Sequence, residues 1–234
     1  MRLAVIPARG GSKRIPRKNL KDFCGRPIMA WSILAAKDSG CFDRIIVSTD
    51  DAEIAAVARE LGAEVPFMRP EELANDHAAT VPVIRHAVQW QADNGAAPAH
   101  ACCIYATAPF VRPEDLRRGF ETLRERGSRY ALSVTGYGYP VQRGLRLTAE
   151  GRVAMLQPEH LYTRSQDLPE VFHDAGQFYW GLAEAWLQGE GLLNEGSAPV
   201  ILPRYRVQDI DTEEDWRRAE LMFRALAEME GKAT

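Results

Sequence analysis

Residues 2–19 read RLAVIPARGGSKRIPRKN, and they decide how the rest of the sequence is interpreted. The opening RLAVIP is a short apolar run, which is typical of a strand buried on both faces of a sheet. Two adjacent glycines and five cationic side chains follow it. A glycine-rich turn at the carboxyl end of the first strand is where open parallel sheets bind ligands. The stretch therefore predicts an α/β sheet with a binding site for an anion at its edge.

Strand-like and helix-like segments alternate along most of the remaining chain. Short apolar runs predict further strands at residues 43–48, 63–67, 100–105, 130–134, 175–180 and 200–202. Helical spacing and capping signals predict helices at residues 27–37, 51–61, 80–93, 113–126 and from 212 onward. The last helix opens with Thr212 and Asp215 at the spacing of a capping box. This alternation predicts a doubly wound, mostly parallel sheet with right-handed crossovers.

The alternation stops between residues 136 and 174, a stretch rich in glycine, proline and arginine. A structureless loop of that length is unusual inside a compact domain. We therefore predict a single domain, 1–234, that carries residues 136–174 as an inserted arm. The arm keeps apolar residues at Val141, Leu145, Leu147, Val153, Met155, Leu156 and Leu161. A second copy of the chain could cover them, which predicts a homodimer formed through this dimerisation arm.

Charge and composition argue against two classes of partner. The formal net charge is −3 and the cations gather in one loop, so neither nucleic acid nor a membrane is an expected partner. No apolar stretch approaches the ~20 residues that span a bilayer. The four cysteines form no C-x-x-C pair, which together with the lack of a signal-like start leads us to expect a cytoplasmic protein with free thiols.

The loop after the first strand has the composition of a polyphosphate site. Gly10 and Gly11 permit a close approach of backbone N–H groups to an anion. Arg9 and Lys13 add positive charge suited to several phosphates. The loop is neither a Walker A motif nor a dinucleotide fingerprint. A solvated basic loop is the alternative, but the position directly after the first strand favours phosphate binding.

Asp209 and Asp211 are the candidate metal ligands. If residues 207–210 are extended, side chains two positions apart project to the same face. Two carboxylates without Cys or His suit Mg²⁺, which also binds triphosphate oxygens. The alternative is an acidic helix start favoured by the helix dipole. That alternative explains the acidic residues after Asp211 better than it explains Asp209. Two further aspartates, Asp50 and Asp51, are left outside the site as candidate helix caps.

Five stretches resemble the cytidylyltransferases that make CMP-activated nonulosonic (sialic-type) acids. They are IPARGGSKRIPRKN (6–19), CFDRIIVSTDD (41–51), MRPEELANDHAAT (68–80), TRSQDLPEVFHDAGQFYW (163–180) and DIDTEEDW (209–216). The resemblance covers nearly the whole chain. It implies a Rossmann-like nucleotidyltransferase fold, with CTP and a nonulosonic acid as substrates. The opening loop would then hold the triphosphate of CTP.

The same resemblance implies roles for individual residues. Arg9, Lys18 and Asp211 would act in catalysis. The sequence does not identify the base that removes the hydroxyl proton: Asp211 is the nearest plausible carboxylate, and a metal-bound hydroxide or water is the alternative. Residues assigned to nucleotide binding are Ala8, Gly10, Ser12, Asn19, Arg69 and Thr80. Asn19 has an alternative role in satisfying turn backbone. His77 is interpreted as a solvated loop residue rather than a ligand.

The resemblance also implies a sugar site. Arg164 would bind the carboxylate of the sugar acid, while Gln166, His173 and Gln177 would read its N-acyl and hydroxyl groups; an ordinary polar loop is the alternative. The block HDAGQFYWG looks more like the pseudaminic acid branch of the family than the N-acetylneuraminic branch. Pseudaminic acid is therefore the expected substrate, with N-acetylneuraminic and legionaminic acids as alternatives. A nucleotide-binding module without catalysis would be expected to lack the Asp209 and Asp211 pair.

Overall fold

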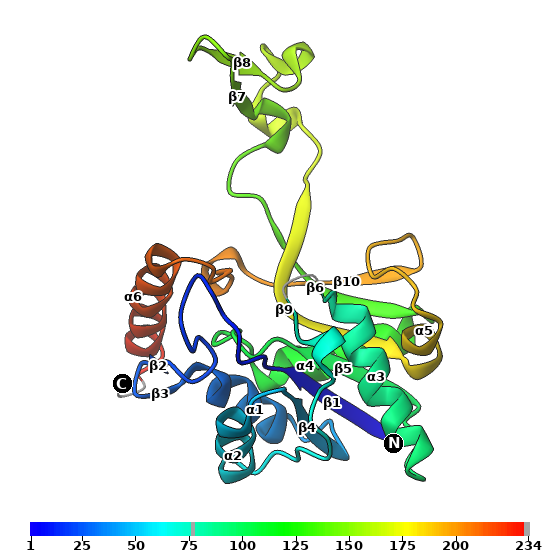
Figure 1. Ribbon diagram of the computed structural model, residues 1–234. Helices are drawn as coiled ribbons and strands as arrows, with labels where there is room; N and C mark the ends of the chain where they lie inside the picture. Colours follow the sequence, from blue (N-terminus) through cyan, green and yellow to red (C-terminus); the bar gives the residue numbers. More distant parts are fainter. Residues whose placement is uncertain (76–77, 232–234) are drawn as a thin grey trace.

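A six-stranded mixed sheet forms the body of the computed structural model, which describes residues 1–75 and 78–231. His77 lies outside these residues. The strand order is β10-β6-β9-β5-β1-β4 (Figure 1). Neighbouring strands run parallel except β9, which is antiparallel to both β5 and β6. The strands are β1 (Arg2–Pro7), β4 (Arg44–Ser48), β5 (His100–Ile104), β6 (Tyr130–Gly136), β9 (Phe172–Leu182) and β10 (Ser197–Ile201).

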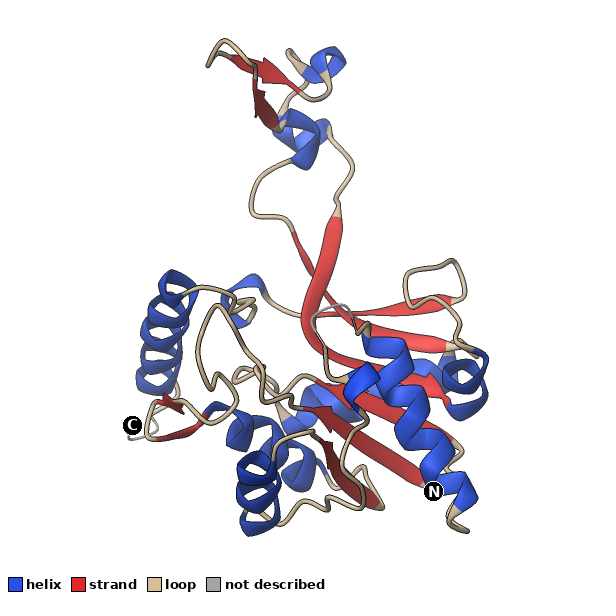
Figure 2. Cartoon of the chain, viewed as in Figure 1, coloured by secondary structure: helices blue, strands red, loops and turns tan. Residues whose placement is uncertain are grey.

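Helices cover both faces of the sheet (Figure 2). One face packs against α1 (Ile28–Ser39), α2 (Ala52–Glu60) and α4 (Pro113–Glu125). The other packs against α3 (Thr80–Asp93) and α5 (Ala183–Gln188). Successive side chains of β1 enter the two cores in turn, because strand side chains alternate between faces. The uninterrupted apolar run at the start of the sequence follows from this burial on both sides.

The last helix, α6 (Glu213–Met229), packs through Trp216 and Ala219 against a third cluster that includes Phe23 of the small hairpin β2 (Asp22–Phe23) and β3 (Arg26–Pro27). The five 3₁₀ turns in the described residues span Glu71–Leu73, Val141–Arg143, Pro158–His160, Ser165–Asp167 and Arg204–Arg206. Across residues 1–75 and 78–231, no helix combines the length and the apolarity needed to cross a membrane.

The predicted α/β alternation is confirmed, and so is the capping box of Thr212 and Asp215. One predicted strand is wrong. Residues 63–67 contribute only an isolated bridge, in which Glu64 pairs with Ile46 of β4. Pro66 follows two residues later and has no N–H to donate, so the ladder stops there.

Gly119 lets α4 approach β9 closely. A Cβ atom at this position would lie 2.7 Å from both Phe178 Cε2 and Trp180 Cδ1. We expect Gly119→Ala to lower the free energy of unfolding by about 1–3 kcal/mol, because overpacking outweighs the better helix propensity of alanine. Urea denaturation measures the loss. Gly191→Ala is the control, since its added Cβ meets no atom within 4 Å; equal effects in the two variants would contradict this packing argument.

The segment between β6 and β9, residues 137–171, stands away from the body as an arm (Figure 1), within the bounds 136–174 predicted for it. It contains the short hairpin of β7 (Leu145–Leu147) and β8 (Val153–Met155). Six apolar or aromatic residues on the arm are at least half exposed: Leu145, Leu147, Val153, Leu156, Leu161 and Tyr162. Surface of this kind in a single copy of the chain is characteristic of an interaction site.

Candidate active site

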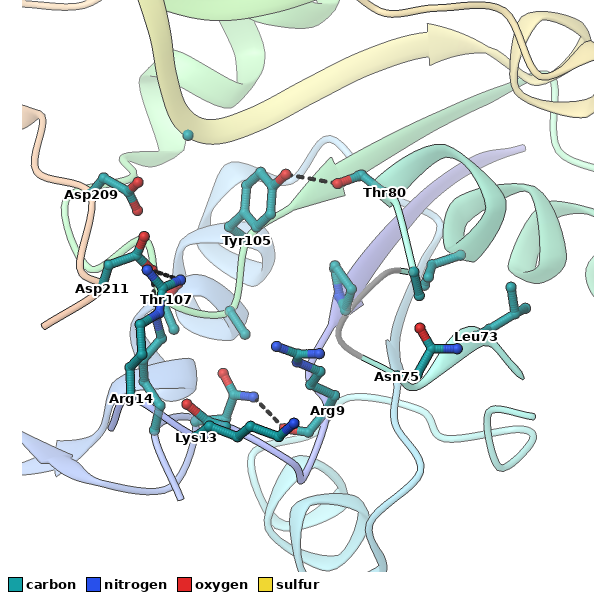
Figure 3. A pocket seen from close by; sticks show the side chains of 18 of the residues that line it. Arg9, Lys13, Arg14, Leu73, Asn75, Thr80, Tyr105, Thr107, Asp209 and Asp211 are labelled. Atoms are coloured by element: carbon teal, nitrogen blue, oxygen red, sulfur yellow. Dashed lines mark hydrogen bonds and ion pairs between the residues drawn. The ribbon is translucent and has the colours of Figure 1, made fainter. Parts of the chain in front are cut away.

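A pocket of about 720 Å³ opens at the carboxyl ends of β1 and β5. Its basic side is formed by the loop after β1, and its acidic side by the segment before α6 (Figure 3). The predicted site residues that line it are Arg9, Ser12, Lys18, Asn19, Arg69, Thr80, Asp209 and Asp211. Segments from both ends of the chain therefore meet at the sheet edge where this class of fold binds ligands.

Two aspartates after β4 hold the glycine loop in place. The Gly10 N–H donates to Asp50 Oδ1 at 3.0 Å. A Cβ on Gly10 would lie 2.7 Å from Asp51 Oδ2, so a larger residue does not fit without a shift. Asp51 caps α2 by accepting from the backbone of Glu53 and Ile54. Asp51 is thus confirmed as a helix cap, and it also lies directly against the glycine loop at Gly10.

Asn19 supports the same loop from its other end. Its side chain is 7% exposed, and its Nδ2 donates to the backbone oxygen of Arg9 at 2.9 Å. Arg9 extends into the middle of the pocket, and Lys13 lies along one side of it (Figure 3). The turn role considered for Asn19 is present in the structure, although the residue also lines the pocket.

Asp209 and Asp211 both face the pocket beside two cations (Figure 3). Arg14 Nη2 lies 2.8 Å from Asp211 Oδ1, and Lys18 Nζ lies 3.5 Å from the same oxygen. Lys18 also donates to the backbone oxygen of Ile210. Burial and the negative charge of Asp211 raise the pKa of Asp209, against the opposing effect of Lys18. The charge of Asp211 therefore acts on Asp209 in addition to the effect of burial.

This donor set fits a magnesium ion. The described residues hold no group of three or more Asp, Glu, His or Cys side chains able to bind a metal. Mg²⁺ commonly uses one or two carboxylates and completes its shell with water and substrate phosphates. Asp209 and Asp211 would supply the carboxylates, and the neighbouring basic loop is where phosphates would lie.

Arg69 is a buried cation in the wall of the pocket, 6% exposed. Its Nε donates to Ser48 Oγ at 3.0 Å, and its guanidinium also donates to the Ser48 backbone oxygen. Burial lowers the pKa of Arg69 to about 10, so the group stays protonated at neutral pH. A charge fixed in this way is preorganised for a ligand, because little rotamer freedom remains to be lost.

The pocket residues that were not predicted include three with interacting polar groups, Tyr105, Tyr179 and Asp174. Tyr105 OH and Thr80 Oγ1 are 2.8 Å apart, and the hydroxyl of Tyr179 donates to Asp174. Burial raises the pKa of Tyr105 to about 12, so its proton remains available for hydrogen bonding. The signal that could have found them is position: Tyr105 directly follows β5, at the same sheet edge as the glycine loop.

The other predicted site residues are not among the described residues that line this pocket. Ala8 is fully buried, and Gly10 turns the loop. His173 packs its ring against Tyr137 at the base of the arm, with centroids 4.8 Å apart. Gln177 is buried in β9.

Two further predicted sugar ligands, Arg164 and Gln166, lie on the arm itself. The side chain of Arg164 is 72% exposed and pairs with Asp167 at 2.7 Å. Gln166 lines a smaller hollow at the neck of the arm, together with Tyr139 and Pro169. Among the described residues, neither Arg164 nor Gln166 lines the main pocket of its own chain.

Comparison with known proteins identifies the class. The family model described as Cytidylyltransferase matches residues 3–189, and the chain belongs to this family. The pseudaminic acid cytidylyltransferase of Campylobacter jejuni is 40% identical over 222 residues, covering 95% of this chain and 96% of the relative. The CMP-N,N'-diacetyllegionaminic acid synthase of Legionella pneumophila is 30% identical over 225 residues, with coverages of 94% and 95%.

A solved structure shares the fold. CMP:2-keto-3-deoxy-manno-octonic acid synthetase complexed with CTP aligns with a TM-score of 0.68 at 16% identity. The alignment covers 96% of this chain and 99% of that one. The predicted Rossmann-like nucleotidyltransferase architecture is thereby confirmed.

Proposed function

We propose that this cytidylyltransferase transfers CMP from CTP to the anomeric hydroxyl of pseudaminic acid, a nine-carbon 2-keto sugar acid. The C2 hydroxyl oxygen bonds to the α-phosphorus, the bond from that phosphorus to the β-phosphate oxygen breaks, and pyrophosphate leaves. The observation that carries the proposal is the pocket itself, in which a basic glycine loop faces the Asp209 and Asp211 pair.

Each side of the pocket has a task in this reaction. Arg9, Ser12 and Lys18 bind the triphosphate and neutralise the charge that grows on pyrophosphate as it leaves. Arg69 and Thr80 hold the cytidine end. Asp211 is the carboxylate to which we assign the proton of the reacting hydroxyl, taken up directly or through water.

Asp209 and Asp211 would hold Mg²⁺ in the working enzyme. Bound there, the ion would stabilise negative charge on the α-phosphate and the leaving group. Arg14 and Lys18 balance the charge of Asp211 in the structure. The cytoplasmic location stays a prediction from the sequence.

The choice of sugar rests on the comparisons and on the HDAGQFYWG block. The relative that carries the pseudaminic acid name is 40% identical, and the legionaminic relative 30%. We expect kcat/KM with CTP and Mg²⁺ to be at least about tenfold higher for pseudaminic acid than for legionaminic or N-acetylneuraminic acid. Pyrophosphate release measured with the three acids under one set of conditions tests this. A clear preference for another acid would reassign the substrate and leave CMP transfer intact.

We further propose a homodimer in which the arm of one copy completes the sugar site of the other. Arg164 and Gln166 reside on the arm, which projects away from its own body (Figure 1). The apolar side chains exposed on the arm would be covered in such a pair. Light scattering should give twice the chain mass of 26.1 kDa, and a fully active monomer would rule this assembly out.

Shared sites predict complementation between two inactive proteins. Asp211→Ala removes a proposed catalytic carboxylate from the body, and Arg164→Ala removes a proposed sugar ligand from the arm. If the arm acts on the partner, each mixed dimer contains one intact site, so random co-expression should restore about a quarter of the wild-type activity per subunit. Each variant expressed alone is the control. Activity no higher than the controls would mean that the arm serves its own subunit.

A further inference from the structure

Gln177 is a buried glutamine whose side chain does not line the pocket but bonds to Arg206, in the loop before α6. It is 3% exposed on β9. Its Nε2 donates to the backbone oxygen of Arg206 at 2.5 Å, whereas its Oε1 has no hydrogen-bond partner among the described residues. A buried polar atom without a partner costs roughly 1–3 kcal/mol. An apolar residue would suit the core better, so the contact to Arg206 needs a reason other than stability.

A large bulge in β9 directs this side chain. Leu132 pairs with Tyr179 and Val134 with Asp174, so two residue steps on β6 are opposed by five on β9. The Oγ of Ser133 accepts from the backbone N–H groups of Gln177 and Phe178 at 3.3 and 3.0 Å and so ties the bulge to β6. Bulges commonly re-aim side chains beside active sites, and this one turns Gln177 toward the loop before α6.

Arg206 is fixed at its side chain as well as at its carbonyl. Its Nη1 lies 2.5 Å from Asp115 Oδ2, and the two side chains are 8% and 1% exposed. Asp115 lies in the first turn of α4. A buried pair of this kind sets geometry more than it adds stability, because desolvation offsets much of the attraction. Arg206 is therefore anchored three residues before Asp209.

The far end of the same segment is also held. Ile210 is 1% exposed in the cluster beneath α6. The Asp211 N–H donates to Asp215 Oδ2 at 3.1 Å, within the capping box of the helix. The two candidate metal carboxylates thus lie on a short segment that is held on both sides.

We propose that Gln177, with Arg206 and Asp115, is a positioning group that sets the spacing and direction of the Asp209 and Asp211 carboxylates for a divalent cation. The inference rests on the proposed function, because it takes these carboxylates to be the metal ligands. It replaces the sugar contact predicted for Gln177 with a role exerted through the metal site.

The test is Mn²⁺ affinity of the enzyme–CTP complex, measured by water proton relaxation without sugar acid. Gln177→Met keeps the length of the side chain and removes its donor, and we expect the Kd for Mn²⁺ to rise about tenfold. Gln91→Met is the matched control, since Gln91 is also fully buried but bonds to Arg44 far from the pocket. The control should keep wild-type affinity. If Gln177→Met fails to fold, Arg206→Lys tests the same link, because lysine lacks the paired donors of arginine.

The outcomes separate the inference from the proposed function. Asp211→Ala should abolish tight Mn²⁺ binding. If it does so while Gln177→Met and Arg206→Lys keep wild-type affinity, the positioning role is overturned and the proposed function stands. If Gln177→Met raises the KM for the sugar acid and leaves the Mn²⁺ affinity unchanged, the positioning role is wrong and Gln177 acts in sugar binding instead. If Asp211→Ala itself leaves Mn²⁺ binding unchanged, the metal assignment fails and this inference fails with it.

Discussion

Asp211→Ala is expected to lower kcat at least about a hundredfold while leaving the fold intact. The substitution removes one of two proposed metal carboxylates and the nearest acceptor for the hydroxyl proton, and losing a single preorganised charge interaction in an active site commonly has an effect of this size. Its ion pair with the 68% exposed side chain of Arg14 contributes little to stability. Steady-state kinetics at saturating CTP and sugar acid measure the loss.

Glu64→Ala is the matched control for this variant. Glu64 also pairs with an arginine at the surface, Arg44, but lies away from the pocket. It should keep wild-type turnover, and both variants should unfold at similar urea concentrations. Near-normal turnover in Asp211→Ala, or activity that survives excess EDTA, would contradict the metal assignment.

Lys18→Ala and Arg9→Ala should each reduce kcat/KM by about ten- to a hundredfold. Charge-assisted contacts to a phosphate are worth roughly 1.5–3 kcal/mol each, and charge grows on pyrophosphate as the bond breaks. Both kcat and the affinity for CTP should therefore fall. We expect the larger loss of kcat/KM for Lys18→Ala, because the Lys18 side chain is only 17% exposed and already bonds to the Ile210 backbone oxygen.

Lys21→Ala separates a phosphate site from a generally basic loop. Lys21 belongs to the same region but pairs with Glu213 and stacks over Trp216, outside the pocket. Its removal should change kcat/KM by no more than about twofold. Equal losses in all three variants would indicate long-range electrostatics, and changes within about twofold for Lys18 and Arg9 would indicate a solvated loop.

The sequence was most informative where local rules agree with the fold. The apolar run of β1 followed by Gly10 and Gly11 fixes strand, turn and sheet edge together, so the position of the pocket could be predicted. Thr212 and Asp215 likewise specify the start of α6 through contacts three residues apart. These features depend on neighbours in the chain and so leave a readable pattern.

Features that depend on pairing between distant segments could not be predicted in the same way. The β9 bulge arises from the register of β9 against β6 and from the hydroxyl of Ser133. That register turns Gln177 toward Arg206 and brings Asp174 to the pocket. The strand predicted at residues 63–67 was wrong for a related reason, because Pro66 limits how far the pairing with β4 can extend.

Mass spectrometry of the products formed from CTP, Mg²⁺ and pseudaminic acid tests the central claim most directly. We expect one CMP conjugate of the sugar acid and one pyrophosphate for each CTP consumed, and at least about a hundredfold less of both products in the same time when Asp211→Ala replaces the wild-type protein. CTP that remains intact with pseudaminic, legionaminic and N-acetylneuraminic acids alike, or that is converted only to CDP and phosphate, would contradict it.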